Sequence, residues 1–263
     1  AALACLFTGT ELVALPETLD EREAAASLHG LSLDLVFADE PLAALACLQG
    51  RPRIALADLP ERAEPHQGPD IDRCPGTRVI AFTSGSTSAA KLKSFRVELG
   101  STAAFAEAFT GAFGLGHDDL WLVCHSLSHI VHLEYVLGGL WWGYDVALVD
   151  VMRLLMNGAQ LRPSVVVTVP SVYEQLAQRI RRARAKLPPR VEDDGASGPR
   201  RALTPAAAAV IGDRTKVMII GAAPSAAPLQ RELLDAGLPL FEGYGMSELG
   251  MIACNVPGHA RVG

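Results

Sequence analysis

Aromatic residues are scarce in this chain of 263 residues, in which Phe, Trp and Tyr together make up 6%. Proteins that hold single-stranded nucleic acids stack the bases on aromatic side chains, so the composition disfavours that class. An excess of basic residues is also lacking, because 23 Lys and Arg stand against 29 Asp and Glu, for a net charge of −6. Without a basic footprint we expect no nucleic-acid partner.

Cysteine pairs and long apolar runs are lacking as well. The five cysteines are odd in number and include no C-x-x-C, which argues against a disulfide framework or a cysteine-based zinc site. We expect reduced thiols and a cytoplasmic location. The most apolar stretch, 130–149, is interrupted by His132, Glu134 and Asp145, so no integral membrane span is predicted. The apolar N-terminus has no basic region before it, which argues against a signal peptide.

The composition can nevertheless bury a core, since 49% of the residues are hydrophobic and 20% are charged. Short apolar runs alternate with amphipathic helical segments. This alternation predicts an α/β fold with mixed, largely parallel sheets flanked by helices. We expect strands at 11–15, 33–38, 54–56, 78–83, 120–124, 146–149, 165–169, 216–220 and 239–241, and helices at 19–28, 41–48, 98–113, 129–142, 173–186, 204–211 and 228–236.

Proline and glycine divide the chain. Residues 61–77 hold three prolines and two glycines, which predicts a linker between an α/β segment at 1–60 and a larger part at 78–263. Residues 187–201 combine proline, glycine and charges of both signs, so we expect weak order there. The chain begins with Ala1 rather than Met, and neither end closes an element. We therefore expect truncation at the ends.

The segment 79–91 ends a buried strand in small hydroxylic residues and then reaches Lys91. A loop with free N–H groups and hydroxyl donors suits a polyphosphate, and Lys91 would add a point charge. The spacing is not that of a Walker loop. The alternative interpretation is a Ser/Thr-rich surface turn.

A second segment, 241–248, reads Phe-Glu-Gly-Tyr-Gly-Met-Ser-Glu. Two glycines flank Tyr244, so backbone and ring can lie flat beside a planar base. Glu248 could bind Mg²⁺ through a carboxylate oxygen. The alternative is a glycine-rich turn with a solvated glutamate.

Together these two segments resemble the adenylate-forming superfamily of acyl- and aryl-CoA synthetases, peptide-synthetase adenylation domains and luciferases. Residues 83–91 follow its phosphate loop, [ST]-[SG]-G-[ST]-[ST]-G-x-P-K-G, and 244–248 match its Y-G-x-[ST]-E motif. Three further landmarks occur in the family's order: S-L-S-H at 126–129, V-P at 169–170 and G-A-A-P at 221–224. The resemblance covers 79–263 and implies part of the family's N-terminal domain, without the C-terminal lid.

The resemblance implies ATP-dependent activation of a small carboxylic acid to an acyl-adenylate. The acyl group would then pass to CoA or to the phosphopantetheine of an acyl carrier protein. The chain departs from the family at Ser88 and Ala90, where the motif has glycine and proline. These departures and the missing lid leave an alternative, a non-catalytic scaffold that binds a nucleotide or a partner.

The resemblance also implies a role for each matched residue. Lys91, Ser247 and Glu248 would be catalytic, and Glu248 would hold Mg²⁺. His129, Ile130, Glu134 and Gly138 would line the acyl pocket. The nucleotide would contact Thr83, Ser84, Gly85, Ser86, Thr87, Gly221, Ala222, Ala223, Gly243, Tyr244 and Gly245.

The residues after His129 bear on the substrate. Amino-acid adenylation domains resemble one another in placing an Asp there, against the substrate ammonium, whereas this chain has Ile130 and Val131. An ammonium buried without a counter-charge is costly, so we expect a fatty or aryl acid. Glu134 is either a pocket group or a buried acid satisfied by the fold. The missing side chain of Gly138 would leave room for the substrate.

Two further clusters have two interpretations each. His125, His129 and His132 lie close in sequence to Cys124, where a metal site is conceivable although no zinc signature is complete; pocket lining or core is the alternative. The basic run at 179–190 predicts a solvated face paired with the acids at 192–194. Its alternative is a docking surface for an acidic carrier protein or the CoA phosphates.

Overall fold

A computed structural model gives the structure of the chain. It describes residues 9–15, 20–38, 44–55, 77–83, 91–97, 99–188, 202–246 and 249–262, together with Cys5 and Asp58. These residues fall into two compact units, the first formed by 1–101 with 126–129 and the second by 102–125 with 130–263. Nearly all of the predicted linker and of the segment expected to be weakly ordered lies outside the described residues.

The first unit contains two small sheets and one capped helix. Strand β4 (Thr77–Thr83) pairs in parallel with β1 (Leu12–Ala14) and antiparallel with β5 (Lys91–Val97). Strands β2 (Val36–Phe37) and β3 (Arg53–Ile54) form a parallel pair.

Helix α2 (Glu21–Leu28) has Asp20 as its N-cap and lies within the predicted range 19–28. The Glu23 N–H donates to the Asp20 carboxylate at 2.8 Å, and the Asp20 N–H donates to the Glu23 carboxylate at 3.2 Å. This reciprocal capping box satisfies N–H groups that a helix start leaves free. Glu21 also accepts from the N–H groups of Ala46 and Cys47, at 2.7 and 3.0 Å. That contact ties α2 to the 3-10 turn at Ala46–Leu48.

The second unit is built on a six-stranded sheet of order β11-β10-β9-β8-β6-β7. Neighbouring strands from β7 to β10 are parallel, and β11 returns antiparallel to β10, which confirms the predicted mixed, largely parallel fold. The strands are β6 (Leu120–Val123), β7 (Asp145–Leu148), β8 (Val165–Thr168), β9 (Val217–Ile220), β10 (Leu240–Met246) and β11 (Gly250–Cys254). The helices are α3 (Leu99–Phe113), α4 (Ile130–Trp142), α5 (Val151–Leu161), α6 (Pro170–Arg184), α7 (Pro205–Ile211) and α8 (Ala227–Asp235).

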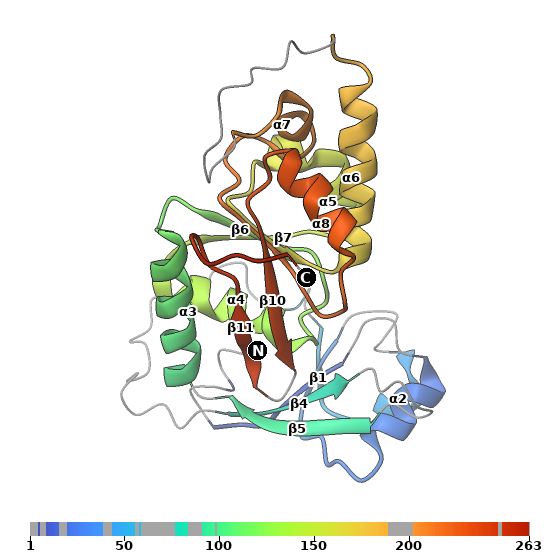
Figure 1. The fold of residues 1–263 in the computed structure, drawn as a ribbon. Helices are drawn as coiled ribbons and strands as arrows, with labels where there is room; N and C mark the ends of the chain where they lie inside the picture. Colours follow the sequence, from blue (N-terminus) through green and yellow to red (C-terminus); the bar gives the residue numbers. More distant parts are fainter. Residues whose placement is uncertain are drawn as a thin grey trace. The chain divides into compact units, whose positions relative to one another are not determined.

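Helices cover both faces of this sheet, so its central strands are apolar on both sides. Leu122, Val166 and Met218 pack into the core beneath α5, α6, α7 and α8. Their neighbour Trp121 points to the opposite face, where it packs on Phe109 of α3 and Tyr135 of α4, with ring centroids 5.1 and 5.2 Å apart. Figure 1 shows α5 to α8 gathered on one side of β6 and β7, with α3 and α4 on the other. Because successive side chains of a strand alternate between its two faces, β6 contributes Leu122 to one core and Trp121 to the other.

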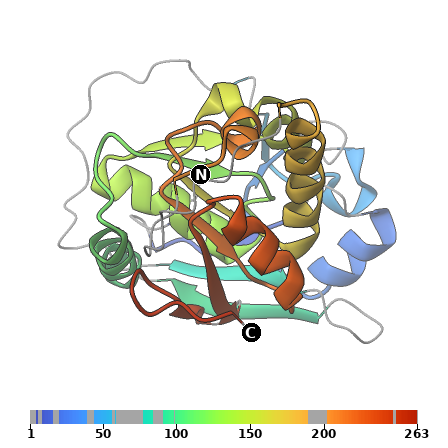
Figure 2. The same ribbon diagram turned by 45° about the horizontal axis from the view of Figure 1, so that its top comes forward.

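Helices α6 and α8 lie side by side, as Figure 2 shows. Arg181 of the basic run forms an ion pair with Glu232 of α8 across this contact. Part of the run is thus paired within the fold. The acids at 192–194, which we expected as its partners, lie outside the described residues.

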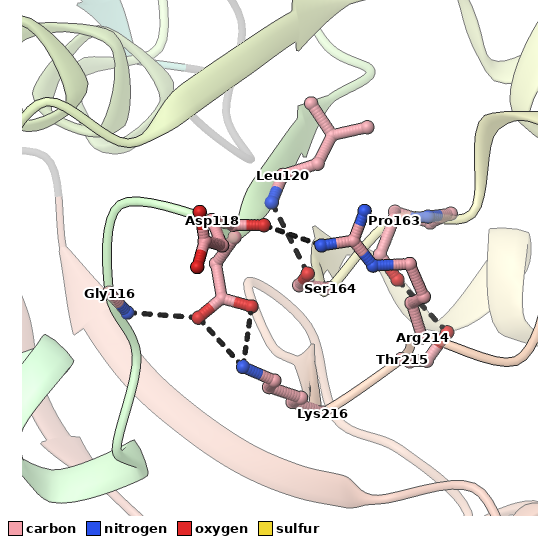
Figure 3. Close-up of polar contacts among 9 residues, drawn as sticks. Gly116, Asp118, Leu120, Pro163, Ser164, Arg214, Thr215 and Lys216 are labelled. Carbon is pink, nitrogen blue, oxygen red and sulfur yellow. Dashed lines mark hydrogen bonds and ion pairs between the residues drawn. The ribbon is translucent and has the colours of Figure 1, made fainter.

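A polar network fastens the amino ends of β6, β8 and β9 (Figure 3). The Asp119 side chain is 1% exposed, and the Lys216 ammonium lies 2.8 and 3.0 Å from its two oxygens. The Gly116 N–H donates to the same carboxylate at 2.9 Å. Burial raises the pKa of Asp119, but hydrogen bonds from Lys216, the Gly116 N–H and Ser164 outweigh burial, and the net pKa is lowered. The amino edge of the sheet is therefore fixed by an ion pair between a buried carboxylate and a half-exposed lysine.

The structure also bears on membrane-spanning helices and on the state of the cysteines. In the part of the chain that is described, no helix is long and apolar enough to cross a membrane. Cys5, Cys47, Cys124 and Cys254 are free thiols.

Candidate functional site

The carboxyl ends of the parallel strands bring together several of the predicted site residues. His125 lies just beyond β6, Thr168 ends β8, Gly221 follows β9, and Gly243 to Gly245 form the later part of β10. Because these strands are parallel, their carboxyl ends lie at one edge of the sheet, where α/β proteins bind ligands.

Three glycines make a close-packed cradle in this region. A Cβ on Gly221 would lie 2.6 Å from the Gly243 carbonyl oxygen, and one on Gly243 would lie 2.8 Å from Cγ2 of Ile219. A Cβ on Gly245 would lie 2.5 Å from the Gly250 carbonyl oxygen. Gly221 and Gly245 require glycine because their neighbours are backbone oxygens that cannot rotate away, whereas at Gly243 the neighbour is a methyl group of Ile219.

The cradle presents an exposed aromatic ring and a strained turn. Tyr244 stands between two of the glycines and is 65% exposed. Ala222, which follows Gly221, has φ of +64°, a left-handed conformation that side chains other than glycine rarely adopt. Such conformations concentrate at functional sites. Small residues beside an open ring suit a flat ligand such as a nucleotide base.

Gly221→Ala is expected to weaken binding of an ATP analogue about tenfold, because the new methyl group would push the Gly243 carbonyl out of the cradle. Binding of a non-hydrolysable ATP analogue can be measured by calorimetry. Gly111→Ala on α3 is the matched control, since a Cβ there meets nothing within 4 Å. Equal affinity in both variants would show that the cradle does not contact the nucleotide.

The predicted phosphate loop begins at the end of β4 and finishes at the start of β5, two strands that pair antiparallel. Thr83 and Lys91 are partners in the last register position of β4 and β5. Ser84 to Thr87 lie outside the described residues, as do Ser247 and Glu248. Strands β4 and β5 belong to the first unit and Tyr244 to the second. The meeting of this loop with Tyr244 therefore stays a prediction.

His125 and His132 form a small cluster beside the end of β8. The Nε2 atom of His125 lies 2.6 Å from the Thr168 hydroxyl, and the rings of His125 and His132 are 5.1 Å apart. Among the residues that the structure describes, no group of three His, Cys, Asp or Glu side chains could hold a metal ion. His129 is exposed at the turn before α4, where its N–H donates to the Ser126 carbonyl at 3.2 Å.

Glu134 points from α4 toward β11. A Cβ on Gly250 would lie 2.9 and 3.1 Å from its two carboxyl oxygens. Gly250 has φ of +64°, so both its backbone and its lack of a side chain fit this contact. Burial raises the pKa of Glu134 to about 7. The expectation that the fold would satisfy this acid finds no support in the described residues, where it has no hydrogen bond or ion pair.

The expectation that Gly138 leaves room for the substrate is wrong. A Cβ there would lie 2.5 Å from the Tyr144 hydroxyl oxygen, and one on Gly139 would lie 2.5 Å from Cγ2 of Val146. The Tyr144 hydroxyl donates to the Tyr135 carbonyl at 2.8 Å. The fold itself fills this space with the side chain of Tyr144, which lies just after the end of α4 and turns back onto the helix.

The sheet with a glycine cradle at its carboxyl edge places the chain among α/β proteins that bind ligands where parallel strands end. The chain matches the AMP-binding enzyme family over residues 1–263, and it belongs to that family. It is 24% identical over 255 residues to the 2-succinylbenzoate–CoA ligase of Bacillus pumilus, a match that covers 93% of this chain and 45% of that protein.

Two solved structures share the fold. A malonyl-CoA ligase with bound methylmalonyl-CoA and AMP superposes with a TM-score of 0.73 at 20% identity, covering 100% of this chain and 52% of that one. The O-succinylbenzoate coenzyme A synthetase of Bacillus subtilis, with ATP and magnesium, gives a TM-score of 0.72 at 20% identity, covering 98% and 49%. The chain thus spans about half the length of these relatives.

Proposed function

We propose that this chain is the nucleotide- and acyl-binding part of an enzyme that activates a small carboxylic acid with ATP and transfers the acyl group to CoA. The observation that carries the proposal is the cradle of Gly221, Gly243 and Gly245 beside the exposed Tyr244 ring, in a chain of the AMP-binding family. Solved relatives contain AMP, ATP with magnesium and a CoA thioester.

The glycine contacts and the exposed Tyr244 ring support an adenine nucleotide as the ligand. In the proposed arrangement Tyr244 and the glycine backbone flank the base, and the turn of Gly221, Ala222 and Ala223 borders it. ATP would supply the adenylyl group: the substrate carboxylate would attack the α-phosphorus, forming an acyl-adenylate, and pyrophosphate would leave. Thr83, Ser84, Gly85, Ser86, Thr87 and Lys91 would hold the phosphates, with Ser247 at the α-phosphate and Glu248 as the ligand for Mg²⁺.

The protein's task in this reaction is to hold two anions together. A substrate carboxylate and a polyphosphate repel each other, so they need N–H donors, a lysine and a divalent cation fixed in place beforehand. His129, Ile130 and Glu134 are the proposed acyl-pocket residues. A thiol of CoA, or of a carrier protein's phosphopantetheine, would then take the acyl group.

The test is pyrophosphate exchange by the full-length protein across a panel of fatty, aryl and amino acids. We expect exchange with at least one acid, and at least about tenfold higher kcat/KM for acids without an α-amine than for matched amino acids. A preference for the amine-bearing partner would overturn the proposed substrate class. Tight nucleotide binding without exchange for any acid would favour the non-catalytic scaffold.

A further inference from the structure

The described elements that pack around Glu134 carry no Lys or Arg. Helix α4 packs against α3, β6, β7 and β11, and β11 pairs with β10. None of these six elements contains Lys or Arg. Their titratable groups are Glu107 on α3, His132, Glu134 and Tyr135 on α4, Asp145 on β7, Glu242 and Tyr244 on β10, and Cys254 on β11, with Tyr144 just before β7.

The thiol and the tyrosine hydroxyls near Glu134 supply no positive charge. Burial raises the pKa of Cys254 to about 11, and burial also raises the pKa values of Tyr135 and Tyr144, so these three groups are neutral near pH 7. Asp145 is exposed at the start of β7. A partly buried carboxyl without a counter-charge favours its protonated form.

Gly250 connects Glu134 to the cradle. A Cβ added to Gly250 would lie 2.9 and 3.1 Å from the Glu134 carboxyl oxygens, and a Cβ added to Gly245 would lie 2.5 Å from the Gly250 carbonyl oxygen. In an acyl-adenylate the acyl group is bonded to the nucleotide's phosphate, so it must start beside the cradle. An acyl chain that continues from there toward α4 reaches Glu134.

From this geometry, and resting on the proposed function, we propose that Glu134 determines substrate specificity. As an uncharged acid it donates a hydrogen bond to a neutral polar group, such as a ketone or hydroxyl oxygen, of a monocarboxylic substrate. A substrate with a second carboxylate at this position would meet an acid and no Lys or Arg on the described elements around it. It is therefore disfavoured, in contrast to the 2-succinylbenzoate named for the relative from Bacillus pumilus.

The first experiment compares three acids that differ by one group each. They are 2-succinylbenzoate, 4-oxo-4-phenylbutanoate, which lacks the ring carboxylate, and 4-phenylbutanoate, which also lacks the ketone. We expect the full-length enzyme to prefer the keto monoacid over both others by about tenfold in kcat/KM. A preference for the diacid would overturn the proposal, as would equal use of all three.

The second experiment uses the best acid of the whole panel and measures KM together with direct acid binding by calorimetry, from pH 6 to pH 8. The wild type should lose affinity about tenfold over this range as Glu134 ionises. Glu134→Gln keeps a donor and cannot ionise, so its affinity should stay constant with pH, while Glu134→Leu should bind about tenfold more weakly at pH 6. Glu107→Gln, at an exposed position on α3, is the matched control and should behave as the wild type.

The outcomes separate the two proposals. Exchange activity that is unaffected by Glu134→Gln and Glu134→Leu at every pH overturns the role of Glu134 and leaves the proposed function standing. Affinity that rises with pH for an amine-bearing acid would mean that Glu134 pairs with a cation instead, which also overturns it. Absence of exchange with every acid overturns the proposed function itself.

Discussion

Asp119→Ala is expected to lower the free energy of unfolding by about 3 kcal/mol, because it leaves the Lys216 ammonium without its partner and removes a buried acceptor. The Gly116 N–H loses its acceptor as well. The amino ends of β6, β8 and β9 are held together by this network, so loss of the Asp119 carboxylate should destabilise the whole second unit. Chemical denaturation followed by circular dichroism measures the change.

The control for Asp119 is a surface ion pair of the same type. Asp213 lies 2.8 Å from the Arg162 guanidinium, with side chains 66% and 52% exposed. Solvent screens such pairs, so Asp213→Ala should leave the unfolding free energy close to that of the wild type. If the two variants are destabilised equally, burial of Asp119 is not the cause.

The contribution of Asp119 to the free energy of unfolding should also depend on pH. Because its pKa is lowered in the folded state, the carboxylate stabilises the fold above its unfolded pKa of about 4. That stabilisation is lost as the pH falls through the folded pKa. The difference in stability between wild type and Asp119→Ala should therefore narrow between pH 6 and pH 3, and a constant difference would argue against a charged Asp119.

Replacing both Lys91 and Glu248 by alanine is expected to reduce pyrophosphate exchange about a hundredfold or more. In the proposed site Lys91 neutralises the phosphates and Glu248 holds the divalent cation, and both act where charge must be offset for the reaction to proceed. Affinity for a non-hydrolysable ATP analogue with Mg²⁺ should fall in parallel. Titration of the full-length double variant measures that affinity.

A matched pair of substitutions controls for net charge. Lys93→Ala and Glu107→Ala remove the same two charges, from β5 and from an exposed position on α3, outside both motifs. This control should keep wild-type affinity and exchange. Unchanged analogue affinity in the Lys91→Ala, Glu248→Ala variant would place the nucleotide elsewhere.

The sequence by itself determined the class of fold. The apolar runs at β6, β8 and β9 are buried on both faces, and strands of that kind occur in parallel sheets covered by helices. The start of α2 is also a local feature, since its capping box is formed by Asp20 and Glu23, three residues apart. Motif order likewise identified the family, because the phosphate-loop and tyrosine motifs are local strings.

Three elements escaped prediction for local reasons. Helix α5 carries Asn157 and Gly158 in its interior, and these residues favour turns. Its Gly158 is required by tertiary packing, since a Cβ would lie 2.6 Å from the Val210 carbonyl oxygen. Strands β5 and β11 are each the second strand of a hairpin and obtain their pairing from β4 and β10. Neither has an apolar alternation strong enough to predict it alone.

What only the tertiary structure decided is which residues share a space. Gly138 looked open in sequence and is filled by Tyr144, and Asp119 gave no sign of its pairing with Lys216, 97 residues away. Glu134 could be recognised as an unusual acid, but its contact with Gly250 depends on how α4 packs against the β10–β11 hairpin. Local patterns set secondary structure and motifs, whereas these contacts depend on how the elements turn back and pack on one another, for neighbours such as Gly138 and Tyr144 as much as for distant pairs such as Asp119 and Lys216.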